Sequence, residues 1–141
     1  MLIGISPLLG PDLLHTLRAM GHGDEIALVD GNYPAAEHAR RLIRADGIHL
    51  MPMLRAILKI FPVEAAFRAS LNNDPAQRGV IHQALDDLCH TSAQDFSLTP
   101  LAGEQLYPRI RSAYAIIATS EPELFANVIL RKAALAPSST E

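Results

Sequence analysis

The sequence lacks the residues on which several classes of protein depend. It has no tryptophan, only 5% aromatic residues and a single cysteine, Cys89, so an internal disulfide is excluded and the reducing cytoplasm is the expected location. The net charge is −3, and no cluster of lysine and arginine could follow a phosphate backbone, which argues against nucleic-acid partners. No apolar run approaches the roughly 18 residues of a membrane-spanning helix, so no membrane partner is expected.

A signal peptide is not expected at the N-terminus. The first residues, MLIGISPLLGPDLL, carry no basic segment, and two prolines interrupt their apolar run. We expect one domain over residues 1–135 and a flexible C-terminal tail over 136–141, where the sequence is APSSTE. A chain of 141 residues, 49% of them hydrophobic, is long enough to bury a core of leucine, isoleucine, valine and alanine.

Hydrophobic periodicity predicts helices alternating with strands. Helices are expected over residues 11–21, 52–61, 75–89 and, broken or shifted by Pro108, 103–113. Strands are expected over residues 26–29, 63–70, 95–102, 114–119 and 126–132. Residues 35–43 fit either a short helix or a loop. This alternation indicates an α/β domain with helices on both sides of a central sheet.

Polar side chains flank the first predicted strand, in the stretch AMGHGDEIALVDGNYPA over residues 19–35. His22 and Asp24 precede the strand, and Asp30 follows it. A histidine beside a carboxylate can move protons near neutral pH, because the carboxylate fixes its tautomer. On the alternative interpretation, both aspartates close turns and His22 is a solvated loop residue.

The other histidines do not form a metal-binding pattern. They are scattered, and none has the paired spacing of a zinc-binding helix: His15, His38, His49, His82 and His90. We expect His82 and His90 on the solvated face of their helix, and Cys89 buried beside them. With no glycine-rich phosphate loop and no nucleophile motif, the sequence predicts neither a metal nor a cofactor, and leaves proton transfer or the binding of a polar small molecule.

A further candidate lies near the C-terminus. Asn127 begins the last predicted strand just after Phe125, and an amide beside an aromatic ring is a common way to hold a sugar. On the alternative interpretation, Phe125 belongs to the core and Asn127 closes a turn.

Three segments together resemble the L-fucose mutarotase and D-ribose pyranase family, with more similarity to the fucose branch. They are ISPLLGPDLLHTLRAMGHGDEIALVDGNYPA, IRADG and FANVILRKA. The resemblance implies a cofactor-free enzyme that interconverts ring forms of a free monosaccharide. It also implies a single three-layer α/β/α domain with a central mixed sheet, assembling into a ring oligomer, often a decamer of two stacked pentamers, with its site between neighbouring subunits.

The resemblance also assigns roles to residues. His22 is the expected acid/base, oriented by Asp24 or another carboxylate, while Asp30, Phe125 and Asn127 are expected to bind the sugar. The base takes the proton of the anomeric hydroxyl and an acid protonates the ring oxygen, so that the ring opens and recloses on its other face.

Two positions depart from the family. Phe125 stands where the family has tyrosine, and Gly103 stands where it has a basic residue, so two hydrogen-bond donors are missing. Tyr33, Tyr107 or Arg109 could replace them. A second hypothesis is therefore a sugar-binding accessory protein of carbohydrate uptake with little or no catalysis, and a third is a purely structural ring protein.

Overall fold

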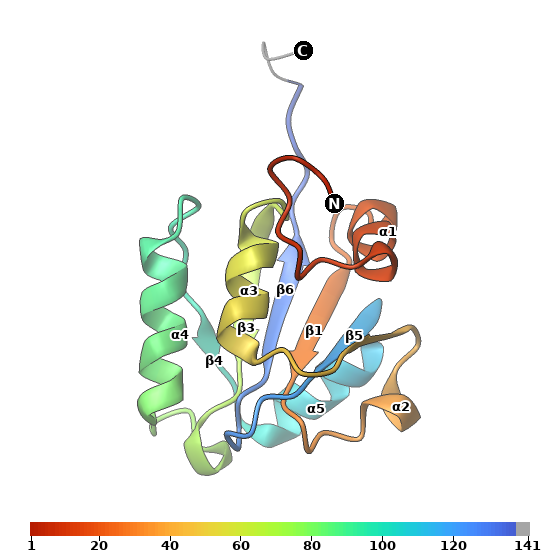
Figure 1. The fold of residues 1–141 in the computed structure, drawn as a ribbon. Helices are drawn as coiled ribbons and strands as arrows, with labels where there is room; N and C mark the ends of the chain where they lie inside the picture. The colour runs from red at the N-terminus through yellow and green to blue at the C-terminus, as the bar shows by residue number, and fades with distance from the viewer. Residues whose placement is uncertain (138–141) are drawn as a thin grey trace.

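Within residues 1–137, the part of the chain that the computed structural model describes, helices and six strands form a single α/β unit (Figure 1). In chain order the elements are α1 (Pro11–Ala19), β1 (Glu25–Val29), α2 (Ala35–His38), β2 (Leu42–Ala45), α3 (Leu50–Leu58), β3 (Val63–Arg68), the 3-10 turn η1 (Leu71–Asn73), α4 (Val80–Thr91), β4 (Thr99–Pro100), α5 (Gly103–Ser112), β5 (Ala115–Thr119) and β6 (Val128–Lys132). Of the expected tail, residues 138–141 lie outside the described residues. No helix in the described part is both long and apolar enough to cross a lipid bilayer.

The strands form one sheet in the order β2-β5-β1-β6-β3-β4. The pairs β1–β5, β2–β5 and β3–β4 are parallel, whereas β6 runs antiparallel to both of its neighbours, β1 and β3. The sheet is therefore mixed, as expected. As a consequence, the C-terminal end of β1 and the N-terminal end of β6 lie side by side at the same end of the sheet.

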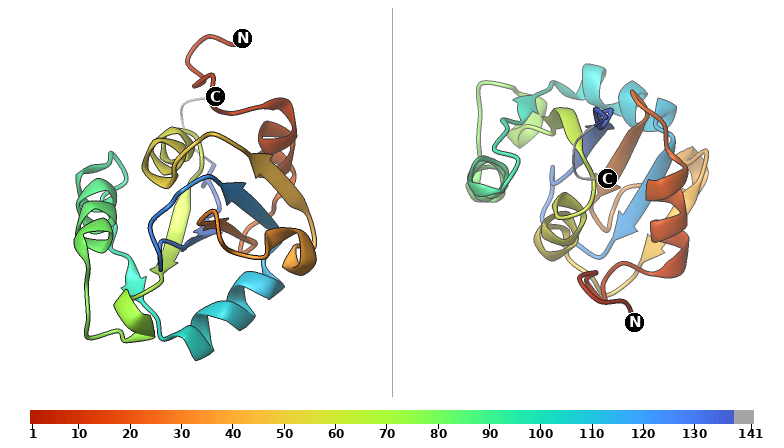
Figure 2. Two further views of the ribbon diagram at one scale, coloured as in Figure 1. Left: turned by 60° about the horizontal axis from the view of Figure 1, so that its bottom comes forward. Right: turned by 90° about the horizontal axis from the view of Figure 1, so that it is seen from above.

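Helices cover both faces of this sheet (Figure 2). On one face, Ile26 and Leu28 of β1 pack in a core that includes residues of α1, α3 and α4. On the other face, Ala27 and Val29 pack with residues of α5 and with Ala35 of α2. The central strands are apolar along their length because both of their faces are buried, which explains why their sequence runs were recognisable.

Strand β2 was not expected. Residues 35–43 fitted a helix or a loop, but α2 has only four residues and β2 follows it. Exposure alternates along β2, with Ile43 and Ala45 buried and Leu42 and Arg44 exposed, and the strand pairs with β5 at the edge of the sheet. Because so short a segment carries little periodicity, its pairing partner decides its conformation.

Two predicted boundaries and the expected effect of Pro108 are also wrong. The third helix begins at Val80 instead of residue 75, because the carboxylate of Asp74 accepts the Ala76 N–H (3.0 Å) and closes a turn there. Of residues 95–102, only Thr99–Pro100 form a strand. Helix α5 continues through Pro108 to Ser112, so this proline neither breaks nor shifts it.

The expectation that His82 is solvated is wrong as well. Helix α4 turns His82, Leu85 and Cys89 inward, and the His82 side chain is fully buried. Val80, at the beginning of the same helix, is 90% exposed although it is apolar. Cys89 is buried, as expected, and burial raises the pKa of its thiol to about 12, so it remains a protonated, unreactive group.

Candidate active site

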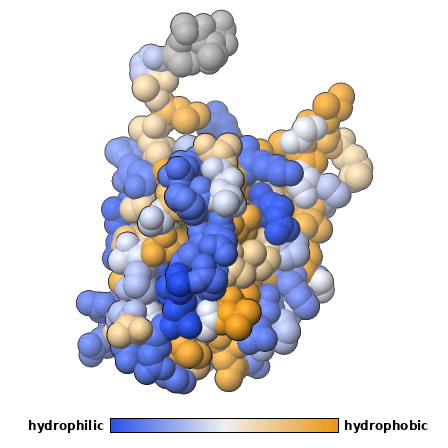
Figure 3. All heavy atoms as spheres, turned by 90° about the vertical axis from the view of Figure 1, so that its left-hand side faces the viewer, coloured by the Kyte–Doolittle hydropathy of each residue, from blue (hydrophilic) through white to orange (hydrophobic). Residues whose placement is uncertain are grey.

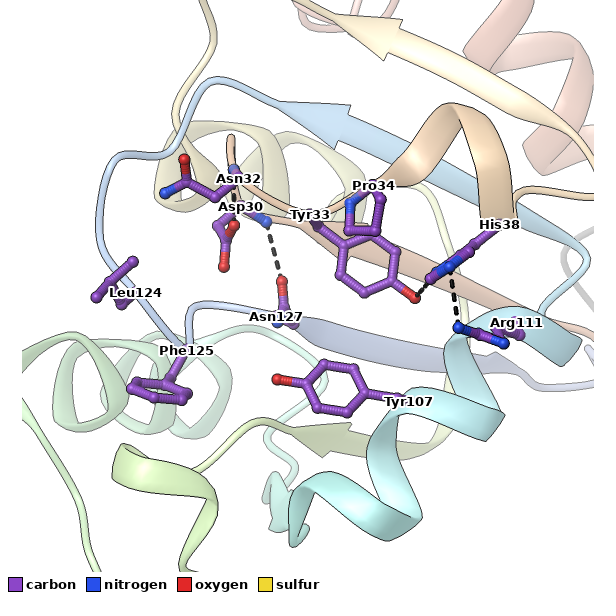
Figure 4. A pocket seen from close by; sticks show the side chains of 10 residues that line it. All are labelled: Asp30, Asn32, Tyr33, Pro34, His38, Tyr107, Arg111, Leu124, Phe125 and Asn127. Atoms are coloured by element: carbon purple, nitrogen blue, oxygen red, sulfur yellow. Dashed lines mark hydrogen bonds between the residues drawn. The ribbon is translucent and has the colours of Figure 1, made fainter.

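A cavity of about 440 Å³ lies at the end of the sheet where β1 finishes and β6 begins (Figure 4). Three of the residues expected to bind a sugar line it: Asp30, Phe125 and Asn127. Its size falls in the range of small-molecule sites, roughly 300–1,000 Å³. The antiparallel pairing of β1 with β6 brings these residues together from positions almost a hundred residues apart.

Asp30 and Asn127 form the polar floor of the cavity. Both are buried, at 7% and 3% exposure, and the Asp30 N–H donates to Oδ1 of Asn127 at 2.9 Å. Because Oδ1 is used in this way, the amide nitrogen of Asn127 is the group that can donate to a ligand. The Asp30 carboxylate accepts the Asn32 N–H at 2.9 Å and closes the turn after β1. Asp30 therefore does what the turn interpretation predicted and also lines the cavity.

Burial raises the pKa of the Asp30 carboxyl above its ordinary value, and the nearby Glu121 carboxylate acts in the same direction. Hydrogen bonds from the backbone of Asn32, Tyr33 and Ala126 oppose this rise without cancelling it. A carboxylate held in this way is an acceptor for a hydroxyl that can replace some of its lost hydration.

A chain of hydrogen bonds lines the opposite end of the cavity. Nδ1 of His38 lies 2.9 Å from the Tyr33 hydroxyl, and the Arg111 guanidinium lies 3.0 Å from Nε2 of His38. A guanidinium only donates, so Nε2 accepts and the neutral ring carries its proton on Nδ1, which donates to the Tyr33 oxygen. The hydroxyl hydrogen of Tyr33 is then available to a ligand.

Aromatic residues form the remaining wall. The Tyr33 and Tyr107 rings are stacked, with centroids 6.3 Å apart, and the Tyr107 hydroxyl points toward the side of the cavity formed by Phe125 (Figure 4). Burial raises the pKa of the Tyr107 phenol, and the charge of Asp30 adds to this, so the phenol remains a donor. Phe125 has a φ of 58°, a left-handed conformation that costs free energy for a bulky residue.

His22 and Asp24 lie at the other end of β1, outside this cavity. The five residues of β1 separate them from Asp30, about 17 Å along a strand. His22 is paired with a carboxylate, but with Glu64 at the start of β3, whose Oε1 is 2.6 Å from Nε2. The Asp24 carboxylate instead accepts the Gly21 N–H at 2.7 Å. Glu64, and not Asp24, is therefore the carboxylate that contacts His22.

Sequence reasoning missed several residues of these two regions. Glu64 gave no signal, because it is one polar residue in a predicted strand, and His38 and Arg111 are brought to the cavity only by tertiary packing. Of the proposed replacement donors, Tyr33 and Tyr107 line the cavity. Arg109 does not: it forms an ion pair with Glu25 at 2.9 Å and lies over the Phe67 ring. In the described part of the chain, no group of three or more histidine, cysteine and acidic side chains could hold a metal.

The space beside Gly103 is filled by neighbouring side chains. A β-carbon built on Gly103 would lie 2.9 Å from the side chain of Asn73 and 3.1 Å from that of Tyr107. Asn73, with a φ of 59°, therefore occupies the space that a larger residue at position 103 would need.

We expect Gly103→Arg alone to destabilise the protein by about 1–3 kcal/mol, as for other overpacked sites. Asn73→Gly should restore that stability in the double variant, because glycine accepts the left-handed conformation and removes the close contact. The measurement is urea unfolding of both single variants and the double variant. A Gly103→Arg protein as stable as the parent would contradict the steric argument.

Comparison with known proteins places these features in one family. Residues 3–135 match the model of the RbsD / FucU transport protein family. The chain is 39% identical to an L-fucose mutarotase of Haemophilus influenzae (strain 86-028NP) over 94% of its length and 96% of the relative's, and 35% identical to the human fucose mutarotase over 94% of each. The structure of the fucose mutarotase of Streptococcus pneumoniae in complex with L-fucose superimposes with a TM-score of 0.78, at 35% identity, over 96% of this chain and all of the other. The chain therefore belongs to the RbsD / FucU family.

Proposed function

We propose that this protein is a cofactor-free sugar mutarotase, an isomerase of the cytoplasm that interconverts the anomers or ring forms of a free, fucose-like monosaccharide. The observation that carries the proposal is the Asp30–Asn127 pair, which offers a buried acceptor and a donor side by side beneath a wall of tyrosines. This combination suits the adjacent hydroxyls and apolar face of a sugar ring. The names of the relatives, L-fucose mutarotase and fucose mutarotase, support the same activity.

In the proposed reaction His22 acts as the base. The proton on Nε2 is directed to Glu64, which leaves the lone pair of Nδ1 to take the proton of the anomeric hydroxyl. The bond between the anomeric carbon and the ring oxygen then breaks, and the ring oxygen is protonated from the cavity side, where Asp30 and the phenols lie. Rotation of the carbonyl and the reverse transfers close the ring on its other face. Asp24 supports this indirectly, by holding the Gly21 amide beside His22.

The distance along β1 leads to a proposal about assembly. His22 cannot reach a sugar held by Asp30 in the same chain, so we propose that a neighbouring copy presents its His22 at the cavity. A closed ring in which each subunit meets the next head to tail satisfies this for every cavity. The family resemblance makes a homodecamer of two stacked pentamers the expected form.

A sugar-binding accessory protein without useful catalysis is the second candidate. Two features favour it: Phe125 carries no hydroxyl in the cavity, and Gly103, which lies outside the cavity lining, carries no side chain where the family resemblance implies a basic residue. Saturation-transfer NMR on free L-fucose, D-ribose, galactose and arabinose tests both candidates. Accelerated exchange between anomers supports the mutarotase, whereas binding without acceleration supports the accessory protein.

The missing hydroxyl gives a prediction about specificity. Phe125→Tyr restores one donor without changing the backbone strain, since both side chains meet the same cost at φ 58°. One hydrogen bond contributes about 0.5–1.5 kcal/mol, so exchange of L-fucose should rise about twofold to tenfold. The parent should accept several sugars, because fewer fixed donors reject fewer ligands. If the parent is selective for D-ribose and Phe125→Tyr changes no exchange rate, position 125 does not determine sugar specificity.

A further inference from the structure

His82 is a buried polar residue that the proposed reaction does not use. The outer side of the molecule around α4 is largely hydrophilic (Figure 3), and Gln83, Asp87 and His90 of that helix are exposed. His82 points the other way and is fully buried. A polar side chain in this position requires hydrogen-bond partners, and their identity links α4 to the cavity.

The two partners fix the tautomer of His82. The Gly79 N–H donates to Nδ1 at 2.9 Å, so Nδ1 carries a lone pair. The proton of the neutral ring is therefore on Nε2, which donates to the carbonyl oxygen of Phe125 at 2.8 Å. The first bond caps the beginning of α4, and the second reaches a residue that lines the cavity.

The segment that contains the Phe125 carbonyl is held by hydrogen bonds on two sides, from the cavity and from α4. Phe125 has an unfavourable left-handed backbone, which persists only where neighbouring groups hold it. On the cavity side, Oδ1 of Asn127 accepts the Asp30 N–H and the Ala126 amide bonds to the Asp30 carboxylate. On the α4 side, the contact is the hydrogen bond from His82.

We infer that His82 is a positioning residue for ligand binding: its hydrogen bond to Phe125 holds residues 124–127 in the conformation that turns Phe125 and Asn127 into the cavity. That the ligand is a monosaccharide rests on the proposed function. The hydrogen bond between His82 and Phe125 is independent of that function, because it is present in the structure of the chain by itself.

The neutral form of His82 is favoured at this buried position. Burial lowers the pKa of His82, and the charge of Arg68 on β3 lowers it further. The hydrogen bond to Phe125 and the charge of Asp86 on α4 oppose this without cancelling it. Asp86 forms ion pairs with Arg68 and with Arg78. A proton added at Nδ1 would face the Gly79 N–H and remove that hydrogen bond. A histidine whose pKa is lowered in the folded state stabilises that state above its ordinary value, about 6.5, and the contribution is lost as the pH falls through the lowered value. Because Nε2 carries its hydrogen in both forms, the contact with Phe125 remains on acidification, and the bond that acid removes is the cap of α4.

Two isosteric substitutions separate the helix cap from the contact with Phe125. In His82→Asn, the amide oxygen lies near the former Nδ1 and can still accept the Gly79 N–H, but no donor reaches Phe125. In His82→Gln, the amide nitrogen extends to the position of Nε2. We expect His82→Asn to raise the KM for L-fucose about tenfold, the value of one hydrogen bond of about 1.4 kcal/mol, with kcat unchanged, and His82→Gln to stay within about twofold of the parent.

A second measurement requires no ligand. Hydrogen exchange of the Ala126 and Asn127 amides should be faster in His82→Asn than in the parent and nearly normal in His82→Gln. Unchanged exchange and unchanged KM in a folded His82→Asn protein would overturn the inference. If the parent binds none of the sugars, the proposed function fails, while the two amides still report whether His82 holds the segment.

Discussion

Replacing His22 by alanine is expected to slow anomer exchange by about 10²-fold or more while leaving the fold intact. General acid–base groups typically contribute about 10²–10⁴-fold, and His22 is the group paired with a carboxylate in the proposed mechanism. Its side chain is 61% exposed, so its removal opens no cavity in the core. The measurement is saturation-transfer NMR on the sugar for which the parent is most active.

The matched control for this variant is His15→Ala. His15 is an exposed histidine on α1 with no place in either candidate region, and its removal should leave the exchange rate unchanged. Thermal unfolding of both variants checks that the fold is retained. If a folded His22→Ala protein exchanges anomers at the parent's rate, His22 does not carry the proton transfer.

Co-expressing two inactive variants should restore part of the activity. His22→Ala keeps the sugar-binding floor, and Asp30→Asn keeps His22 while still accepting the Asn32 N–H. If each site combines His22 of one subunit with Asp30 of its neighbour, one junction in four of a random 1:1 ring contains both intact residues. Co-expressed chains should therefore show about a quarter of the parent's activity, against about 1% or less for either variant alone.

The controls for this experiment concern assembly. Sedimentation should show a large oligomer at micromolar concentration for the parent and for both variants. A second control co-expresses the parent with the double variant that carries both His22→Ala and Asp30→Asn. Only a junction between two parent chains is then intact, which is again one in four, so this mixture gives the reference activity for that fraction. A stable monomer, or a mixture as inactive as its components, would rule out the shared site.

The central strands were predictable because burial on both faces makes them apolar along their length. β1, β5 and β6 coincide closely with predicted runs. The edge elements were harder to predict, because β2 and β4 are short and carry only part of an apolar pattern. β2 was not expected, and β4 was expected but with too great a length. Pro108 was expected to break or shift its helix, but α5 continues through it.

The candidate site was predictable to a similar extent. Asp30, Phe125 and Asn127 stood out because polar and aromatic residues flanked recognisable strands, and all three line the cavity. Glu64 and His82 did not stand out. Each acts through a residue about forty positions away, a pairing that local periodicity cannot reveal.

The sequence by itself determined the α/β class, the buried central strands and the set of residues at both ends of β1, because strand and helix patterns follow from which side chains face the core. Only the tertiary structure decided how those residues are divided. β6 lies antiparallel beside β1, which brings Asn127 to Asp30. At the opposite end of β1, β3 brings Glu64 to His22. A strand has two ends about 17 Å apart, so residues that are neighbours in the sequence pattern are held in separate places in space.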